Sequence, residues 1–145
     1  MGQREGFFWD VMLGRKPPPP AAATLGFKLL DIDESQGTIR VQFEGRPEFV
    51  NPMGVIQGGF LTAMLDDTLG PALVATLDAD SFAPTIELKV NFIRPAPVGK
   101  LIGEGRVVAR GGSIAFLAGE LRTEAGELLA TASATARIVT KKQSG

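Results

Sequence analysis

The 145-residue sequence contains no cysteine, no histidine and no tyrosine. Without cysteine the chain has no disulfide, no thiol nucleophile and no zinc site built on thiolates. Without histidine it has neither a Ser-His-Asp triad nor the usual histidine-based dehydratase or catalytic zinc site. Acid–base chemistry is therefore left to aspartate, glutamate, lysine or water, and we expect neither a metal nor another cofactor.

Charge is nearly balanced, with 15 Lys and Arg against 16 Asp and Glu. This balance gives no electrostatic indication of nucleic-acid binding or of attachment to a membrane surface. No uninterrupted apolar run approaches the roughly 18 residues of a membrane span. The start of the chain also lacks the basic region and long apolar core of a secretory signal. We therefore expect a cytoplasmic protein with no nucleic-acid or membrane partner.

The length fits one compact domain, which we place at residues 25–140. Residues 1–24 precede it as a short aromatic helix within 1–13, packed on the domain or on a partner subunit, and a proline-rich segment. A membrane-surface helix at 1–13 is less well supported, because basic residues are scarce there. Pro17–Pro20 predict a stiff extended connector. Residues 141–145 are polar, and we expect them to be a disordered tail.

Apolar and polar residues alternate through 38–44 and 85–92, which is typical of half-buried β-strands. Turn residues separate the other strand candidates, which are predicted at 26–32, 101–110, 113–123 and 127–139. These long strands indicate an antiparallel meander rather than βαβ units.

One segment, residues 57–77, has the spacing of a helix instead. Its apolar face is predicted to consist of Leu61, Met64, Leu65, Leu69, Leu73 and Leu77. Pro71 lies inside this helix and should bend or interrupt it near Asp67. The sequence thus predicts an α+β fold in which an antiparallel sheet of five to six strands wraps around one central helix, with a short N-terminal helix added.

Two features of the central helix suggest chemistry. Gly58-Gly59 at its start leaves backbone N–H groups unshielded, where a negative or polarised oxygen would be favoured. The glycines could equally serve only a tight loop or close packing. Asp66 and Asp67 project about 100° apart, and Asp66 borders the apolar face. An ordinary solvated helix face would also explain both acids.

These residues form a pattern that resembles a known family. The pattern runs Asn51, Gly54, Gln57-Gly58-Gly59 and Leu65-Asp66, followed by the strand 85–92 and Arg94-Pro95-Ala96. Together these resemble the hotdog-fold acyl-CoA thioesterases, most of all the PaaI-type and 4-hydroxybenzoyl-CoA thioesterase branch. The resemblance covers roughly residues 25–139.

The resemblance implies a role for each matching residue. The N–H of Gly58 would polarise the thioester carbonyl oxygen. Asp66 would act as general base for water or as a nucleophile that forms a mixed anhydride. Asn51 would help bind the carbonyl or hold the loop before the helix, and Thr85 would orient the attacking water. Asp67 would be structural.

Gln57 departs from the family, because many relatives have histidine at this position. Glutamine cannot transfer protons, but it donates and accepts hydrogen bonds. If the histidine serves mainly to orient or polarise, Gln57 can replace it. The carboxylate then remains the only base, and the pH profile of activity should contain no imidazole contribution.

The resemblance also implies contacts to an acyl-CoA substrate and a homodimer, or a dimer of dimers, with Asp66 contributed by the neighbouring subunit. Candidates for the CoA phosphates are Arg94, Arg106, Arg110, Gly111 and Ser113. Candidates for the acyl pocket, each equally at home in the core, are Phe60, Met64 and Phe82. The leading hypothesis is hydrolysis of an acyl-CoA thioester to CoA and a carboxylic acid. The alternative is a non-catalytic protein that binds acyl-CoA or a fatty acyl group, while a hydratase is disfavoured by the missing histidine.

Overall fold

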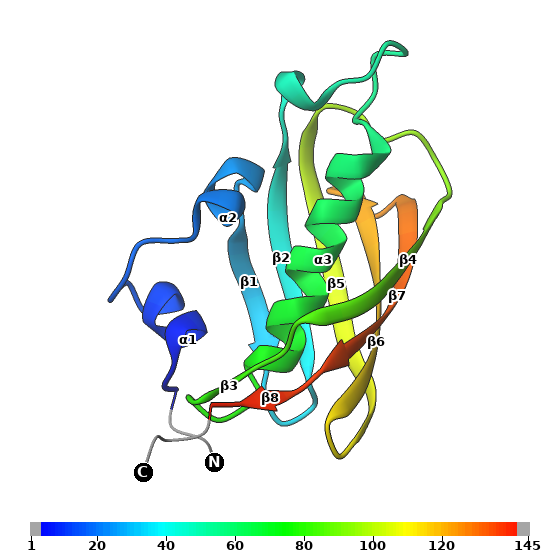
Figure 1. Cartoon of the computed structure of the whole chain (residues 1–145). Helices are drawn as coiled ribbons and strands as arrows, with labels where there is room; N and C mark the ends of the chain where they lie inside the picture. The colour runs from blue at the N-terminus through cyan, green and yellow to red at the C-terminus, as the bar shows by residue number, and fades with distance from the viewer. Residues whose placement is uncertain (1–3, 142–145) are drawn as a thin grey trace.

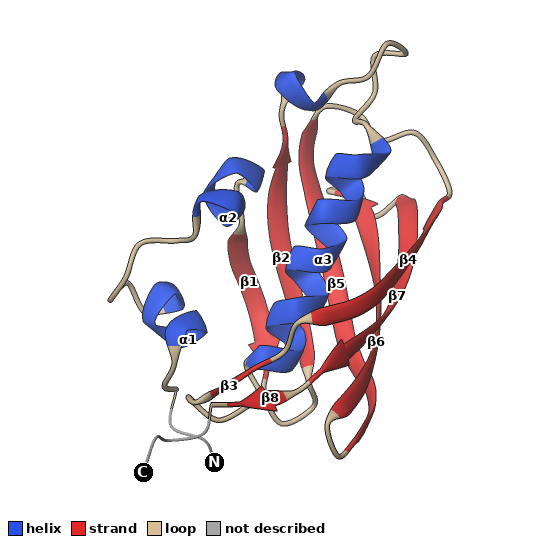
Figure 2. Cartoon of the chain, viewed as in Figure 1, coloured by secondary structure: helices blue, strands red, loops and turns tan. Residues whose placement is uncertain are grey.

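A single long helix lies across one curved antiparallel sheet in the computed structural model, which describes residues 4–141 (Figures 1 and 2). The helices are α1 (Phe7–Met12), α2 (Pro20–Leu25), the 3-10 helix η1 (Pro47–Phe49) and α3 (Gly58–Val74). The strands are β1 (Lys28–Asp33), β2 (Thr38–Gly45), β3 (Ser81–Phe82), β4 (Thr85–Phe92), β5 (Gly99–Gly111), β6 (Ile114–Thr123), β7 (Leu128–Arg137) and β8 (Val139–Thr140). The predicted α+β class, with one central helix and a six-stranded sheet, is confirmed.

The order of the strands places β4 at an edge of the sheet. The six strands follow the order β1-β2-β5-β6-β7-β4, and every pair is antiparallel. The meander is therefore β5-β6-β7, while β4 crosses over and pairs with β7. Strands β3 and β8 form a separate two-stranded sheet. One side of β4 thus has no neighbouring strand within the described sheet.

Glycines in the sheet let α3 approach it closely. Of the predicted apolar face, Leu61, Met64, Leu65, Leu69 and Leu73 are buried in α3, together with Thr68. The last predicted member, Leu77, lies beyond the end of the helix at Val74 and is only partly buried. A Cβ on Gly105 would lie 3.0 Å from Leu69 Cδ2, and one on Gly119 would lie 2.8 Å from the same atom. The absence of side chains at Gly105 and Gly119 therefore leaves the room that Leu69 of the helix occupies.

Pro71 does not interrupt α3, contrary to the sequence expectation. The helix runs unbroken from Gly58 to Val74 with Pro71 inside it. Proline removes its own N–H bond to the carbonyl of Asp67, but Leu69 and Leu73 on either side of it are buried in the core. Tertiary packing keeps the last turn helical.

The proline run is only partly an extended connector. Pro20 is the first residue of α2, a position where the fixed φ of proline suits a helix. The helix ends at Gly26, which has a φ of 70°, and the N–H of Phe27 donates to the carbonyl of Ala22, as is common where glycine ends a helix. The predicted N-terminal helix is α1. Residues 1–3 of that prediction, and the tail from 142 onward, lie outside the described residues.

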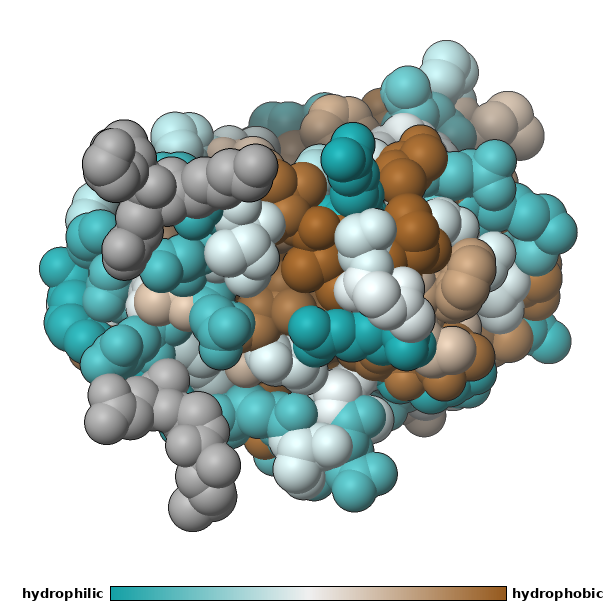
Figure 3. Space-filling view, turned by 60° about the horizontal axis from the view of Figure 1, so that its bottom comes forward, coloured by the Kyte–Doolittle hydropathy of each residue, from teal (hydrophilic) through white to brown (hydrophobic). Residues whose placement is uncertain are grey.

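Large apolar side chains remain exposed along β4 and beside it. Figure 3 looks toward the end of the molecule where β3 and β8 lie and shows apolar surface between hydrophilic residues. The exposed large apolar side chains on β3, on β4 and directly after β4 include Phe82, Ile86, Phe92 and Ile93. Among residues 4–141, no helix has the length and apolar character needed to cross a membrane.

Candidate active site

The first turn of α3 presents two backbone N–H groups without an internal partner. Gln57 is the N-cap, and its side chain makes no capping hydrogen bond. Its carbonyl accepts from the N–H of Phe60 and of Leu61. Within the part of the chain that the structure describes, the N–H groups of Gly58 and Gly59 donate to no protein acceptor. The helix dipole favours a polarised oxygen at such a position.

Asn51 holds the loop that leads into α3. Its Oδ1 accepts from the N–H of Met53 at 2.9 Å and from that of Val55 at 3.4 Å. The backbone N–H of Asn51 also donates to the carbonyl of Val55. Of the two roles expected for Asn51, this geometry corresponds to holding the loop before the helix.

A pocket of about 370 Å³ opens beside Gly58. Its wall is mostly apolar, and its lining residues are Asn51, Val55, Ile56, Gly58, Leu61, Phe92, Ile93, Arg94, Pro95 and Ala96. The structure thus brings Asn51, Gly58 and Arg94 together at one pocket. It does not place the three acyl-pocket candidates there. Met64 is fully buried in the core, Phe60 stacks on Phe49 with ring centroids 4.2 Å apart, and Phe82 is exposed on β3.

Asp66 and Thr85 meet between α3 and the first residue of β4. The hydroxyl of Thr85 donates to Oδ1 of Asp66 at 2.8 Å. Both side chains can be reached by solvent, because Asp66 is exposed and Thr85 is only partly buried. This hydrogen bond fixes the carboxylate on the flank of α3 that faces β4.

Asp67 is the more buried acid of the pair, which the sequence did not indicate. Its Oδ2 is buried and has no hydrogen-bond partner among residues 4–141. Burial, and then the negative charge of Asp66, raise the pKa of Asp67 from 3.8 to about 7. Asp67 is therefore largely protonated in the folded protein at mildly acidic pH.

This raised pKa predicts that Asp67→Asn stabilises the protein only at higher pH. Between about pH 4 and pH 7 the folded state holds a proton that the unfolded state has released, so stability falls as pH rises through this window. Near pH 4.5 we expect almost no change on substitution. Near pH 8 we expect a gain of up to about 4 kcal/mol in the free energy of unfolding, measured by urea unfolding at equal protein concentration. The exposed Asp31 provides the control Asp31→Asn, and an equal gain at both pH values would contradict the assignment.

The expected CoA-binding residues lie at two ends of the sheet. Arg94 lines the pocket beside Gly58, and its Nη1 donates to the carbonyl of Leu128 at 3.0 Å. Arg110 lies instead at the end of the sheet that holds Thr85. From strand to strand, Thr85 on β4 pairs with Ala136 on β7, Ala136 pairs with Ala115 on β6, and Ala115 pairs with Arg110 on β5. Gly111 and Ser113 follow at the adjacent hairpin. One protomer therefore does not gather these candidates in one place.

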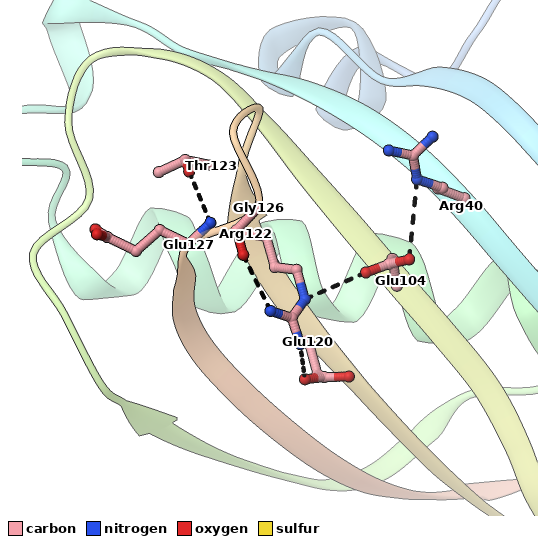
Figure 4. Close-up of polar contacts among 7 residues, drawn as sticks. All are labelled: Arg40, Glu104, Glu120, Arg122, Thr123, Gly126 and Glu127. Atoms are coloured by element: carbon pink, nitrogen blue, oxygen red, sulfur yellow. Dashed lines mark hydrogen bonds and ion pairs between the residues drawn. The ribbon is translucent and has the colours of Figure 1, made fainter.

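A second hollow, of about 300 Å³, lies on the face of the sheet away from α3 and includes Arg106. Figure 4 shows the ion pairs near it, with Glu104 between Arg40 at 3.8 Å and Arg122 at 3.3 Å. Arg122 also bonds Glu120 at 2.6 Å. These charges compensate one another, and Arg106 is separated by the sheet from Gly58 and Asp66.

Sequence reasoning missed Phe92 and Ile93 as site residues. The alternating pattern identifies Phe92 only as one residue of a strand, and its contact with Gly58 depends on the packing of β4 against α3.

Within residues 4–141, no cluster of three or more acidic side chains could hold a metal ion.

The central helix on a curved antiparallel sheet defines a hotdog-type domain. The first turn of that helix carries free amides, and a carboxylate follows about two turns later. A family model described as "Thioesterase superfamily" matches residues 53–130. The chain is 33% identical over 109 residues to an inferred esterase of Saccharolobus solfataricus, a match that covers 73% of this chain and 77% of that protein. The chain therefore belongs to the thioesterase superfamily, a family of hydrolases.

Solved structures agree with this assignment. An inferred thioesterase, a phenylacetic acid degradation-related protein of Ralstonia eutropha JMP134, superposes with a TM-score of 0.88 at 36% identity, over 91% of this chain and 99% of that chain. The protein smu.793 of Streptococcus mutans UA159, solved with bound acetyl CoA, shares the fold at a TM-score of 0.71 and 20% identity, over 81% of this chain and 91% of that one. The resemblance to hotdog-fold thioesterases of the phenylacetate branch is confirmed.

Proposed function

We propose that this protein hydrolyses acyl-CoA thioesters to CoA and a carboxylic acid, at a site shared between two protomers. The observation that carries the proposal is the arrangement along α3, where free amides at Gly58 and the Asp66–Thr85 pair lie at separate points of one helix. The acetyl CoA bound by the related fold of smu.793 supports CoA as the carrier.

The distance along α3 supports a site made by two protomers. Asp66 follows Gly58 by eight residues, which corresponds to about 12 Å along a helix axis. A thioester held at the N–H of Gly58 has its carbonyl carbon only about 3–4 Å from that nitrogen. Asp66 of the same chain is therefore too far away to activate water for that carbon.

Pairing of the edge strand β4 with its copy in a second protomer would bring Gly58 of one chain close to Asp66 of the other. Thr85 at its start lies beside Asp66, and Phe92 at its end lies beside Gly58. An unpaired edge strand is a template for pairing with another chain. Antiparallel pairing of β4 with its copy about a twofold axis would set the Asp66 end of one protomer against the Gly58 end of the other. The exposed side chains of Ile86 and Phe92 would then be partly covered.

In the proposed reaction the Gly58 N–H donates to the thioester carbonyl oxygen and stabilises the negative charge that forms on it. Asp66 accepts a proton from water, whose oxygen attacks the carbonyl carbon. The carbon–sulfur bond then breaks, and CoA leaves as its thiol with the proton that Asp66 took from the water, which regenerates the carboxylate. Thr85 holds the Asp66 carboxylate through its hydrogen bond. In the other route an Asp66 oxygen attacks the carbonyl carbon, the carbon–sulfur bond breaks and CoA leaves as its thiolate, which takes up a proton; water then hydrolyses the mixed anhydride and regenerates the carboxylate.

In the proposed dimer, CoA-binding candidates from both ends of the sheet would lie near the same substrate. Arg94 belongs to the Gly58 end, whereas Arg110, Gly111 and Ser113 belong to the end that holds Asp66. Twofold pairing would bring these groups from two protomers toward one substrate. Gln57, exposed beside Gly58, would contribute neutral hydrogen bonds in place of the histidine that many relatives have.

The test is release of free thiol from a panel of aliphatic and aromatic acyl-CoAs. We expect saturable release above the enzyme-free rate with at least one of them. The alternative function, binding of acyl-CoA without hydrolysis, rests on the presence of Gln57 in place of histidine. It would be supported by saturable binding of the same compounds with no release above background.

A further inference from the structure

The ring of Phe92 lies directly against the start of α3. The three atoms nearest to the position of a Cβ on Gly58 all belong to this ring: Cζ at 3.0 Å, Cε1 at 3.1 Å and Cε2 at 3.5 Å. Gly58 and Phe92 also line the same pocket. Since Phe92 is 55% exposed, the ring packs on Gly58 and still leaves much of its surface open.

This contact places the ring beside any carbonyl held at Gly58. An oxygen that accepts from the Gly58 N–H lies about 2.9 Å from that nitrogen. The carbonyl carbon and its first substituents then lie within about 5 Å of it, the region that the Phe92 ring already borders. Much of the remaining wall is fixed, because Ile56, Leu61 and Ala96 are buried.

We propose that Phe92 determines which acyl groups the site accepts, by limiting the substituents on the carbon next to the thioester carbonyl. The favoured class is acyl thioesters in which this carbon is unbranched or flat, so that it lies along the ring. A branch at this carbon would collide with Phe92 or force the carbonyl away from Gly58. The inference rests on the proposed function and specifies its substrate class.

The experiment compares kcat/KM for butyryl-CoA and isobutyryl-CoA, which differ only in a branch next to the carbonyl. For the unaltered protein we expect a preference of about tenfold or more for butyryl-CoA, the scale on which one misplaced carbon is discriminated. In Phe92→Ala the preference should fall to about threefold or less, through a gain with isobutyryl-CoA, and Phe92→Leu should be intermediate. Phe116 is similarly exposed, at 51%, but lies on the face of β6 away from α3. It provides the control Phe116→Ala, which should leave both kcat/KM values unchanged.

A second variant tests the contact itself. Gly58→Ala keeps the backbone N–H but places a methyl group in the space of the ring. We expect about a tenfold loss of kcat/KM for butyryl-CoA, which Phe92→Ala should largely restore in the double variant, as for two residues in direct contact.

The outcomes separate this inference from the proposed function. An unchanged butyryl preference in Phe92→Ala, or an equal rise for both substrates, would overturn the inference while hydrolysis itself stands. No thiol release by the unaltered protein from any acyl-CoA would overturn the proposed function, and the inference with it.

Discussion

We expect Asp66→Asn to lower kcat for thioester hydrolysis by at least about a hundredfold, the typical contribution of a general base. The substitution keeps the size of the side chain and leaves an amide oxygen that can still accept from Thr85. It removes the negative charge, and with it the ability to take a proton or to attack the carbonyl. The measurement is the rate of thiol release at saturating acyl-CoA, with circular dichroism to show that the fold is retained.

Asp67→Asn is the matched control for this prediction. Asp67 lies one residue further along α3 and projects about 100° away from Asp66, and it has no contact with Thr85 among the described hydrogen bonds. We expect it to change kcat by less than about tenfold, although it changes stability with pH. Equal losses in the two variants would show that the assignment of the helix faces is wrong.

Gly58→Pro should reduce kcat by about a hundred- to a thousandfold, the cost of removing one donor to a developing oxyanion. Proline has no N–H, and the first position of a helix is where it is best tolerated. Gln57 before it has a ψ of 138°, the extended backbone that a residue before proline prefers. The helix should therefore be retained while the donor is lost.

The Phe92→Ala background separates loss of the donor from collision with the ring. In that background Gly58→Ala should recover most of the activity because its N–H is intact. Gly58→Pro should remain inactive there. If both Gly58→Ala and Gly58→Pro regained activity in the Phe92→Ala background, glycine would be needed at this position only to avoid a collision with the Phe92 ring. Its amide would then take no part in the reaction.

Local patterns were sufficient for most of the sheet and for the central helix. The alternation at 85–92 predicted β4 with its observed bounds, and the spacing of the leucines predicted the buried face of α3. The helix α2 was missed because Pro17–Pro20 was read as extended throughout, although a proline at the start and Gly26 at the end are ordinary helix boundaries. The sequence therefore contains the residues from which α2 could have been predicted.

Other features depend on contacts between distant parts of the chain. The sequence identified both Asp66 and Asp67, but their relative burial depends on what packs around α3, so the buried oxygen of Asp67 was not foreseen. The contact between Gly58 and Phe92 joins residues more than thirty positions apart. The place of β4 beside β7, at an open edge, likewise follows from the crossover and not from any local pattern.

The most direct test of a site shared between protomers is to mix Asp66→Asn with Gly58→Pro. Each variant alone is expected to be nearly inactive. After unfolding and refolding together at equal amounts, random pairing into dimers should restore about a quarter of the normal activity, because one site in each mixed dimer combines an intact Gly58 with an intact Asp66 from the other chain. If the mixture stays as inactive as its components although mixed dimers form, the two groups do not act across the subunit boundary and the shared site is contradicted.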